Sequence, residues 1–153
     1  MGMRRRALLL SLTFAVAVLV LAGALAVLAP SGAAPSAGEG ARSGVVTLRE
    51  AYREHRNGLQ VEARGEVIRL LPDDDDGSRH QRFILRLSSG QTVLIAHNID
   101  LAPRLEGLRP GETVAFFGEY EWNPEGGVVH WTHHDPGGDH PGGWLEYQGR
   151  RYH

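Results

Sequence analysis

The hydrophobic residues that follow position 44 have two periods, first that of a helix and then that of a β-strand. Thr47 and Glu50 make a capping box, in which the Thr side chain caps a helix and the Glu side chain bonds back to the cap. Leu48 and Tyr52 begin a helical stripe, and the Asn-Gly pair at 57–58 is a typical helix end. The pattern therefore predicts a short helix followed directly by strands.

From position 59 onward, hydrophobic and polar residues mostly alternate, which predicts strands with one buried face. Turn-forming residues divide this part of the chain into segments. The five predicted strands are residues 59–71, 80–87, 91–97, 113–122 and 128–134. Because the connections between them are short, we expect neighbouring strands to pair in antiparallel fashion.

The stretch between the third and fourth predicted strands has helical spacing instead. Asp100 is placed to cap a short helix over residues 98–108, and Leu101, Leu105 and Leu108 are expected to pack inward. Five antiparallel strands, with a short helix between the third and fourth and a helix in front, are the layout of a small OB-like barrel. The predicted fold class is therefore mostly β and OB-like, and an open antiparallel α+β sheet is the alternative.

The alternation in the last two strands also predicts their register. If residues 124–127 form the loop, Trp122 pairs with Val129 and Glu121 lies beside His130. A slip by one residue would mix polar and apolar side chains on each face, which burial disfavours. The predicted polar face carries Glu119, Glu121, His130, Thr132 and His134.

The N-terminal segment has the composition of a membrane-targeting helix. Three arginines at 4–6 precede an uncharged run at residues 7–29. This run can cross the ~30 Å hydrocarbon core of a bilayer, and it exceeds the ~7–15 residues usual for the apolar part of a signal peptide. We therefore favour a retained anchor, with a cleaved signal peptide as the alternative. By the positive-inside rule, the N-terminus lies in the cytoplasm and the body outside.

These features predict a domain organisation and a location. Residues 1–30 are the transmembrane anchor or signal peptide, residues 31–44 are a flexible tether rich in Ala, Gly, Pro and Ser, and residues 45–153 are the OB-like globular domain. The expected location is the bacterial inner membrane, crossed once, with the domain in the periplasm. Cleavage of the N-terminal segment would instead release a secreted protein.

The composition excludes several classes of function. The chain has no cysteine, which excludes disulfides, thiolate zinc sites and a cysteine nucleophile. Three of the 16 basic residues lie in the first thirty positions, which hold no acidic residue, so 13 basic residues face 18 acidic ones in the remainder. This negative body argues against general nucleic-acid binding, which requires a basic surface.

Half of the eight histidines fall between positions 130 and 140. Imidazole is the commonest metal ligand, and nitrogen and oxygen donors without sulfur suit a divalent transition metal, with zinc expected first. The spacing matches no defined metal motif, so hydrogen bonding to the backbone and to carboxylates is the alternative role. The candidate metal ligands are His130, His133, His134, Asp135 and His140.

A second polar cluster lies where the third strand meets the predicted helix. His97, Asp100 and Arg104 have the chemistry of a base, its orienting acid and an anion-stabilising cation, and they are the catalytic candidates. The alternative role of Asp100 is to cap the helix, with Arg104 as its surface partner. The candidates for ligand binding are His80, Arg82, Asn98, Glu119, Glu121 and Trp144.

Four consecutive aspartates at residues 73–76 raise the question of calcium. An EF-hand loop places its ligands at alternate positions and closes with a glutamate, and that spacing is missing here. A solvated hairpin loop is therefore the better interpretation.

Several strings of residues resemble a bacterial family catalogued only as domain of unknown function 3465. They are residues 79–83, 96–104, 118–123, 126–136 and 143–144, and the resemblance covers roughly residues 60–153. The family implies no activity, substrate or site, so no catalytic role is carried over. The resemblance does imply that His80, His97, Asn98 and residues 130–135 belong to one pattern.

Three functions remain open on the sequence. The first is a membrane-tethered, extracytoplasmic OB-like module that binds a small ligand or an envelope partner. The second is a metal-dependent hydrolase, with phosphodiesters as a suitable substrate because Arg82, Arg86 and Arg104 can stabilise developing negative charge. The third is a periplasmic metal-binding protein that uses the histidine cluster. We rank the binding module first, because no defined catalytic motif is present.

Overall fold

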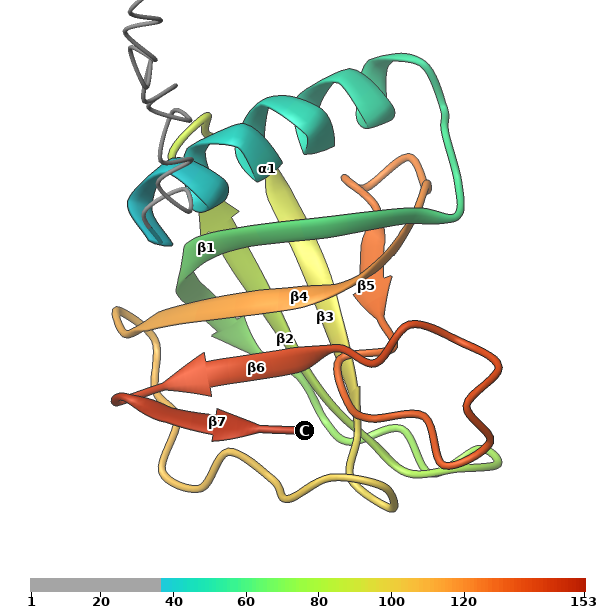
Figure 1. Ribbon diagram of the computed structural model, residues 1–153. Coiled ribbons are helices and arrows are strands. Elements are labelled where there is room, and N and C mark those ends of the chain that lie inside the picture. The colour runs from blue at the N-terminus through green and yellow to red at the C-terminus, as the bar shows by residue number, and fades with distance from the viewer. Residues whose placement is uncertain (1–36) are drawn as a thin grey trace, which may run out of the picture. The chain divides into compact units, whose positions relative to one another are not determined.

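The computed structural model describes residues 37–153, the part of the chain drawn in colour in Figure 1. The expected anchor or signal peptide at 1–30 and the first part of the tether lie outside the described residues. Within residues 37–153, no helix is both long enough and apolar enough to cross a membrane.

One helix and seven strands make up the described chain. They are α1 (Ala37–Arg53), β1 (Leu59–Leu70), β2 (His80–Leu87), β3 (Thr92–Asn98), β4 (Thr113–Glu121), β5 (Val128–His130), β6 (Trp144–Tyr147) and β7 (Arg150–Tyr152). The strands predicted from alternation all exist. The pair β6–β7, which adds to the edge of β4, was not predicted.

The helix α1 begins earlier than expected, so the predicted tether is wrong over residues 37–44, which are helical. Thr47 consequently lies inside the helix and does not cap it. The reason is tertiary packing: Leu48 and Ala51 are buried in the core, and at Gly44 any Cβ would overlap the carbonyl oxygen of Glu62 in β1. Contact with the barrel therefore stabilises helical turns that glycine alone disfavours.

Strands β1 to β5 close into a barrel in the order β1-β2-β3-β5-β4, and β1 pairs with β4 to complete the ring. The twelve-residue β1 serves both neighbours because it bends: its pairing with β2 shifts between Val67 and Arg69. At Gly65, a Cβ would lie 2.8 Å from the Arg86 carbonyl oxygen of β2, so glycine lets the two strands pack closely there.

The prediction that all five strands pair antiparallel is wrong at one junction, because β3 and β5 are parallel. The reason is geometric. Strand directions cannot alternate around a closed ring with an odd number of members, so one neighbouring pair must be parallel. The alternative of an open α+β sheet is also wrong, since β1 and β4 pair over eight residue positions, from Leu59↔Tyr120 to Glu66↔Thr113.

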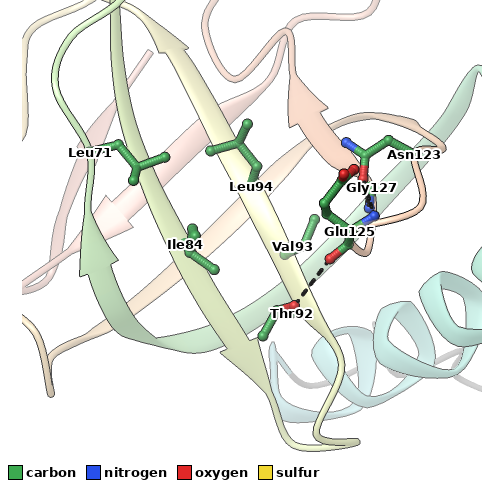
Figure 2. A pocket seen from close by; sticks show the side chains of 8 residues that line it. All are labelled: Leu71, Ile84, Thr92, Val93, Leu94, Asn123, Glu125 and Gly127. Carbon is green, nitrogen blue, oxygen red and sulfur yellow. Dashed lines mark hydrogen bonds between the residues drawn. The ribbon is translucent and has the colours of Figure 1, made fainter.

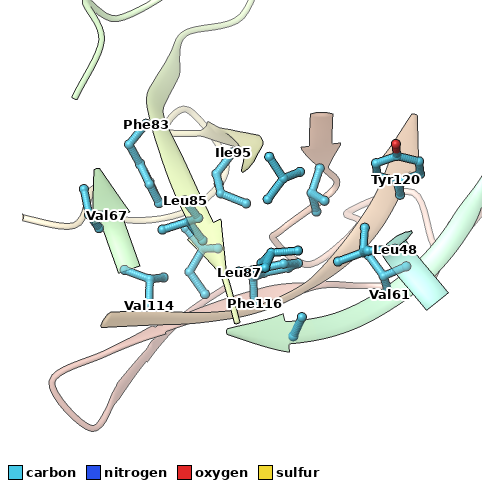
Figure 3. Packing of buried hydrophobic residues seen from close by; sticks show 14 of the residues in the cluster. Leu48, Val61, Val67, Phe83, Leu85, Leu87, Ile95, Val114, Phe116 and Tyr120 are labelled. Atoms are coloured by element: carbon cyan, nitrogen blue, oxygen red, sulfur yellow. The ribbon is translucent and has the colours of Figure 1, made fainter. Parts of the chain in front are cut away.

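The barrel interior holds the hydrophobic face of every barrel strand (Figure 3). Phe83, Leu85, Ile95, Phe116 and Tyr120 are all 0% exposed. Leu48 of α1 joins the same cluster, and Figure 1 shows α1 lying across one end of the barrel.

The predicted short helix at 98–108 does not form, and this segment is a series of turns. Leu105 and Leu108 are buried as expected, whereas Leu101 is 37% exposed. Gln81 explains the difference: its side chain accepts a hydrogen bond from the Leu105 N–H and donates one to the Leu105 carbonyl. These bonds replace helical ones, so the segment packs without forming a helix.

The register predicted for the last barrel hairpin is wrong by two residues. Glu119 pairs with His130 and Tyr120 with Val129, so the connecting loop is longer than expected. A shift of two preserves the faces, and Glu119 and His130 do share the outer face of the barrel. Strand β5 ends at His130 because Trp131 adopts a φ of +51°, outside the strand region. Thr132 is consequently 0% exposed, and His134 leaves the polar face.

Candidate functional site

Two glutamates of β4 and one histidine of β5 meet on the outer surface of the barrel. Glu119 and Glu121 project from the same face of β4, and His130 is the cross-strand partner of Glu119. One ligand atom from each residue lies within 4.8 Å of the others. Gly118 permits this approach, because a Cβ there would overlap the His130 carbonyl oxygen. We call Glu119, Glu121 and His130 the outer cluster.

The Nε2 atom of His130 is sealed from solvent and has no hydrogen-bond partner. Glu119 Oε1 lies 3.7 Å from it, too far for a hydrogen bond. Burial lowers the pKa of His130, although Glu119 and Glu121 act in the opposite direction. The ring is therefore neutral at neutral pH, which is the form that binds metal ions.

His140 reaches the outer cluster from the loop between β5 and β6. Its Nε2 lies 2.7 Å from Glu119 Oε2, and its Nδ1 lies 2.8 Å from the Pro141 carbonyl oxygen. The ring stacks on Trp131 with 4.1 Å between centroids. Burial acts to lower the pKa of His140, but hydrogen bonds to Glu119 and to the Pro141 carbonyl outweigh it and raise the pKa. A protonated ring donates from both nitrogens in this arrangement.

Two further groups hold the carboxylates of the outer cluster. Gln60 Nε2 donates to Glu119 Oε2 at 3.2 Å, and the Gly58 N–H donates to Glu121 Oε1 at 3.2 Å. Within residues 37–153, no arginine forms an ion pair with either glutamate. Gln60 was missed in the sequence because its nearness to Glu119 depends on the pairing of β1 with β4, two strands far apart in the chain.

His97 lies inside the barrel and both of its ring nitrogens are hydrogen-bonded. Nε2 donates to the Pro103 carbonyl at 3.1 Å, so Nδ1 of the neutral ring accepts from Thr132 Oγ1 at 2.9 Å. Burial is the main cause that lowers the pKa of His97 to about 4. The ring is thus a neutral, fully bonded element of the core.

The other two catalytic candidates point elsewhere. Asp100 accepts two hydrogen bonds from Arg79, one from its backbone N–H and one from its Nε, and these bonds lower the pKa of Asp100. Arg104 forms an ion pair with Asp73 instead of Asp100. Within the described residues, no hydrogen bond joins His97, Asp100 and Arg104 to one another, so they do not form a linked catalytic group.

The aspartates at 73–76 lie in the loop after β1, as expected for a hairpin loop. Asp73 binds Arg104, and Asp74 Oδ2 binds Arg82 at 3.3 Å. Two of the four carboxylates are therefore neutralised by arginines, which agrees with a structural role for this loop.

The candidate metal ligands divide into two groups. His130 and His140 both approach Glu119. His133 is buried and donates from Nδ1 to the His134 carbonyl, while His134 is exposed. Asp135 accepts hydrogen bonds from three backbone N–H groups of its own loop, at Gly137, Asp139 and His140. These bonds lower the pKa of Asp135 and hold the loop in shape.

The remaining ligand-binding candidates are spread over the surface. His80 and Asn98 are cross-strand partners at one end of β2 and β3, and Asn98 Oδ1 accepts from the Asp100 N–H. Trp144 is half-buried in β6, with the Arg151 guanidinium 4.1 Å from its ring centroid. Within the described residues, no hydrogen bond or ion pair joins His80, Asn98 or Trp144 to the outer cluster.

A groove lies on the outer face of β2 and β3 (Figure 2). It encloses about 280 Å³ and has an apolar wall that includes Leu71, Ile84 and Leu94. Asn123 and Glu125 of the β4–β5 loop form the other side. Asn123 Oδ1 accepts from the N–H groups of Glu125 and Gly127, so the loop is held in a defined shape.

This groove was not predicted. Ile84 and Leu94 occupy the polar positions of their alternating strands, so a hydrophobic residue there is the signal that sequence analysis could have used.

Comparison with known families shows one match that covers the whole described domain. The family described as "protein of unknown function (DUF3465)" matches residues 37–153, from the first residue of α1 to the end of the chain. A comparison with curated proteins finds no match. Because the match covers more than half of the 153 residues and the whole described domain, the chain belongs to the DUF3465 family.

Proposed function

We propose that this protein is an extracytoplasmic, membrane-tethered module whose OB-like barrel binds a small ligand with an apolar body. The observation that carries the proposal is the groove on β2 and β3. OB-fold proteins bind their ligands on the face of strands 2 and 3 and with the loops that join strands 1 to 2 and 4 to 5. The groove is lined from the same places: Ile84 of β2, Leu94 of β3, Leu71 after β1, and Asn123 in the β4–β5 loop.

The lining of the groove defines the ligand's chemistry. Leu71, Ile84 and Leu94 offer an apolar wall, and the Glu125 carboxylate on the rim can accept a hydrogen bond from the ligand. A volume of about 280 Å³ is near the lower end of ligand pockets, which suits a small ring or a branched aliphatic group. An apolar side chain presented by an envelope protein is the alternative occupant.

The N-terminal sequence supports the proposed location. Residues 4–6 have the positive charge and residues 7–29 the apolar length expected of an anchor whose N-terminus stays in the cytoplasm, and both support a periplasmic barrel. In a cell fractionation, the barrel is expected to stay with the membrane fraction. Protease added to the outside of intact spheroplasts is expected to digest it. A barrel that is protected in intact spheroplasts would contradict this location.

The hydrolase hypothesis is not supported by its catalytic candidates, His97, Asp100 and Arg104. His97 is buried and fully hydrogen-bonded, and Asp100 and Arg104 bind other partners. A hydrolase would therefore need a metal site elsewhere in the domain, and the proposal of a binding module does not require one.

Ligand-observed NMR on the full chain in detergent tests the groove, with indole and cyclohexanol as probes. We expect saturation transfer to at least one probe and its loss in Leu94→Gln, which places an amide on the groove wall. Leu101→Gln is the matched control, because Leu101 is an exposed leucine that does not line the groove. Equal signals in wild type, Leu94→Gln and Leu101→Gln would show that the groove is not the binding site.

A further inference from the structure

We propose that the outer cluster binds a divalent transition metal ion, such as Zn²⁺, through Glu119, Glu121 and His130. This site goes beyond the proposed binding function, because its three ligands do not line the β2–β3 groove. The donor set is two carboxylate oxygens and one imidazole nitrogen, which suits Zn²⁺.

The first argument is geometric. Two ligands of a tetrahedral Zn²⁺ ion, with bonds of ~2.0–2.2 Å, lie about 3.4 Å apart. The ligand atoms of Glu119, Glu121 and His130 are within 4.8 Å of one another, and Glu119 Oε1 and His130 Nε2 are 3.7 Å apart, so side-chain rotations can bring all three into range. The three residues come from two neighbouring strands of a closed barrel, and this rigid support reduces the cost of forming the site.

The second argument is that the Nε2 atom of His130 lacks a hydrogen-bond partner. Nε2 is sealed from solvent and lacks a hydrogen-bond partner, which is costly for a polar atom. Within residues 37–153, the side-chain atoms that share this condition are only Gln60 Oε1 and Gln91 Oε1. Gln60 lies beside the outer cluster, since its Nε2 donates a hydrogen bond to Glu119. A metal ion bonded to His130 Nε2 satisfies that atom.

The third argument concerns charge. Glu119 and Glu121 are like charges on one face of β4, and no arginine within the described residues forms an ion pair with them. Like charges at this spacing repel, so a cation between them is favourable. His140 contacts only one of the two glutamates, through Nε2 and Glu119 Oε2.

The fourth argument is the arrangement around the ligands. Metal-ligating carboxylates are usually hydrogen-bonded by groups around the site. His140 does this for Glu119, with Nε2 bonded to the carboxylate and Nδ1 bonded to the Pro141 carbonyl. The carboxylates also have hydrogen-bond donors, from Gln60 and from the Gly58 N–H. Trp131 stacks on His140 and fixes the plane of its ring.

Titration of Zn²⁺ into the untagged full chain in detergent, with a chromophoric chelator as competitor, tests the proposal. We expect one Zn²⁺ per chain with a Kd below ~10 μM. Binding should weaken at least tenfold in Glu121→Gln and in His130→Ala. Glu66→Gln and His134→Ala are the matched controls, because each removes an exposed side chain of the same type outside the cluster and the groove and should leave the Kd unchanged.

No Zn²⁺ binding by the wild-type chain would overturn the proposal, as would equal weakening in His130→Ala and His134→Ala. If a variant does not fold, NMR of the histidine ring nitrogens in the wild-type chain decides the question. Zn²⁺ should then shift Nε2 of His130 while the rings of His133 and His134 stay unchanged, and the reverse pattern would exclude the site. Because the groove is tested with organic probes on different variants, failure of either proposal leaves the other standing.

Discussion

His97 in β3 and His130 in β5 lie on neighbouring strands, but the hydrogen bonding of their ring nitrogens differs. His97 points into the barrel and both of its nitrogens are hydrogen-bonded, to Thr132 and to the Pro103 carbonyl. His130 points outward and its sealed Nε2 has no partner. A satisfied buried polar group stabilises one packing arrangement, whereas an unsatisfied one beside two carboxylates indicates a place for a cation. The hydrogen-bond environment therefore distinguishes the structural His97 from the proposed metal ligand His130, which their positions in the sequence do not.

The largest expected effect comes from removing the inner histidine. His97→Ala leaves a cavity and an unpaired Thr132 hydroxyl, so the free energy of unfolding should fall by about 3 kcal/mol. Urea denaturation measures this value. His134→Ala, which removes an exposed ring, should change it by less than about 0.5 kcal/mol. Similar losses in both variants would contradict the structural role of His97.

The contribution of His97 to the free energy of unfolding should depend on pH. The pKa of His97 is lowered by burial to about 4 in the folded state, so the unfolded chain binds a proton more readily between that value and the ordinary pKa of 6.5. Stability from His97 is therefore fully present above pH 6.5 and is lost as the pH falls toward 4, by up to about 3 kcal/mol. Electrostatic repulsion from His133 and His80 also acts to lower the pKa of His97.

Urea denaturation of wild type and His97→Gln at several pH values measures this effect. The variant cannot titrate at position 97, so the stability difference between the two proteins should shrink as the pH falls from 6.5 to 4. A difference that is constant over this range would mean that the His97 ring is not held neutral by the fold.

The smallest expected effect is at the outer cluster. In metal-free buffer, Glu121→Gln keeps an oxygen for the Gly58 N–H and removes a like charge beside Glu119, so the free energy of unfolding should change by less than about 0.5 kcal/mol or rise slightly. Chemical denaturation with a chelator present measures this. A loss above about 2 kcal/mol would show that Glu121 stabilises the fold, and the contrast with His97 would then fail.

The hydrophobic pattern correctly predicted β1 to β5, the helix before them and the shared outer face of Glu119, Glu121 and His130. These features depend on local periodicity, which is set by which side chains burial requires on each face. The same pattern failed at residues 37–44 and 98–108. There the backbone follows contacts with distant residues, such as those of Gly44 with β1 and of Leu105 with Gln81.

Only the tertiary structure decided which polar residues meet. Closure of the ring made β3 and β5 parallel, brought Gln60 of β1 to Glu119 of β4, and separated His134 from His130 where Trp131 turns out of the strand. By itself the sequence determined the strands, their buried faces and the absence of thiol chemistry, because these depend on composition and local spacing. Side chains far apart in the chain come together only when the whole barrel closes, so the outer cluster and the groove could not be read from the sequence alone.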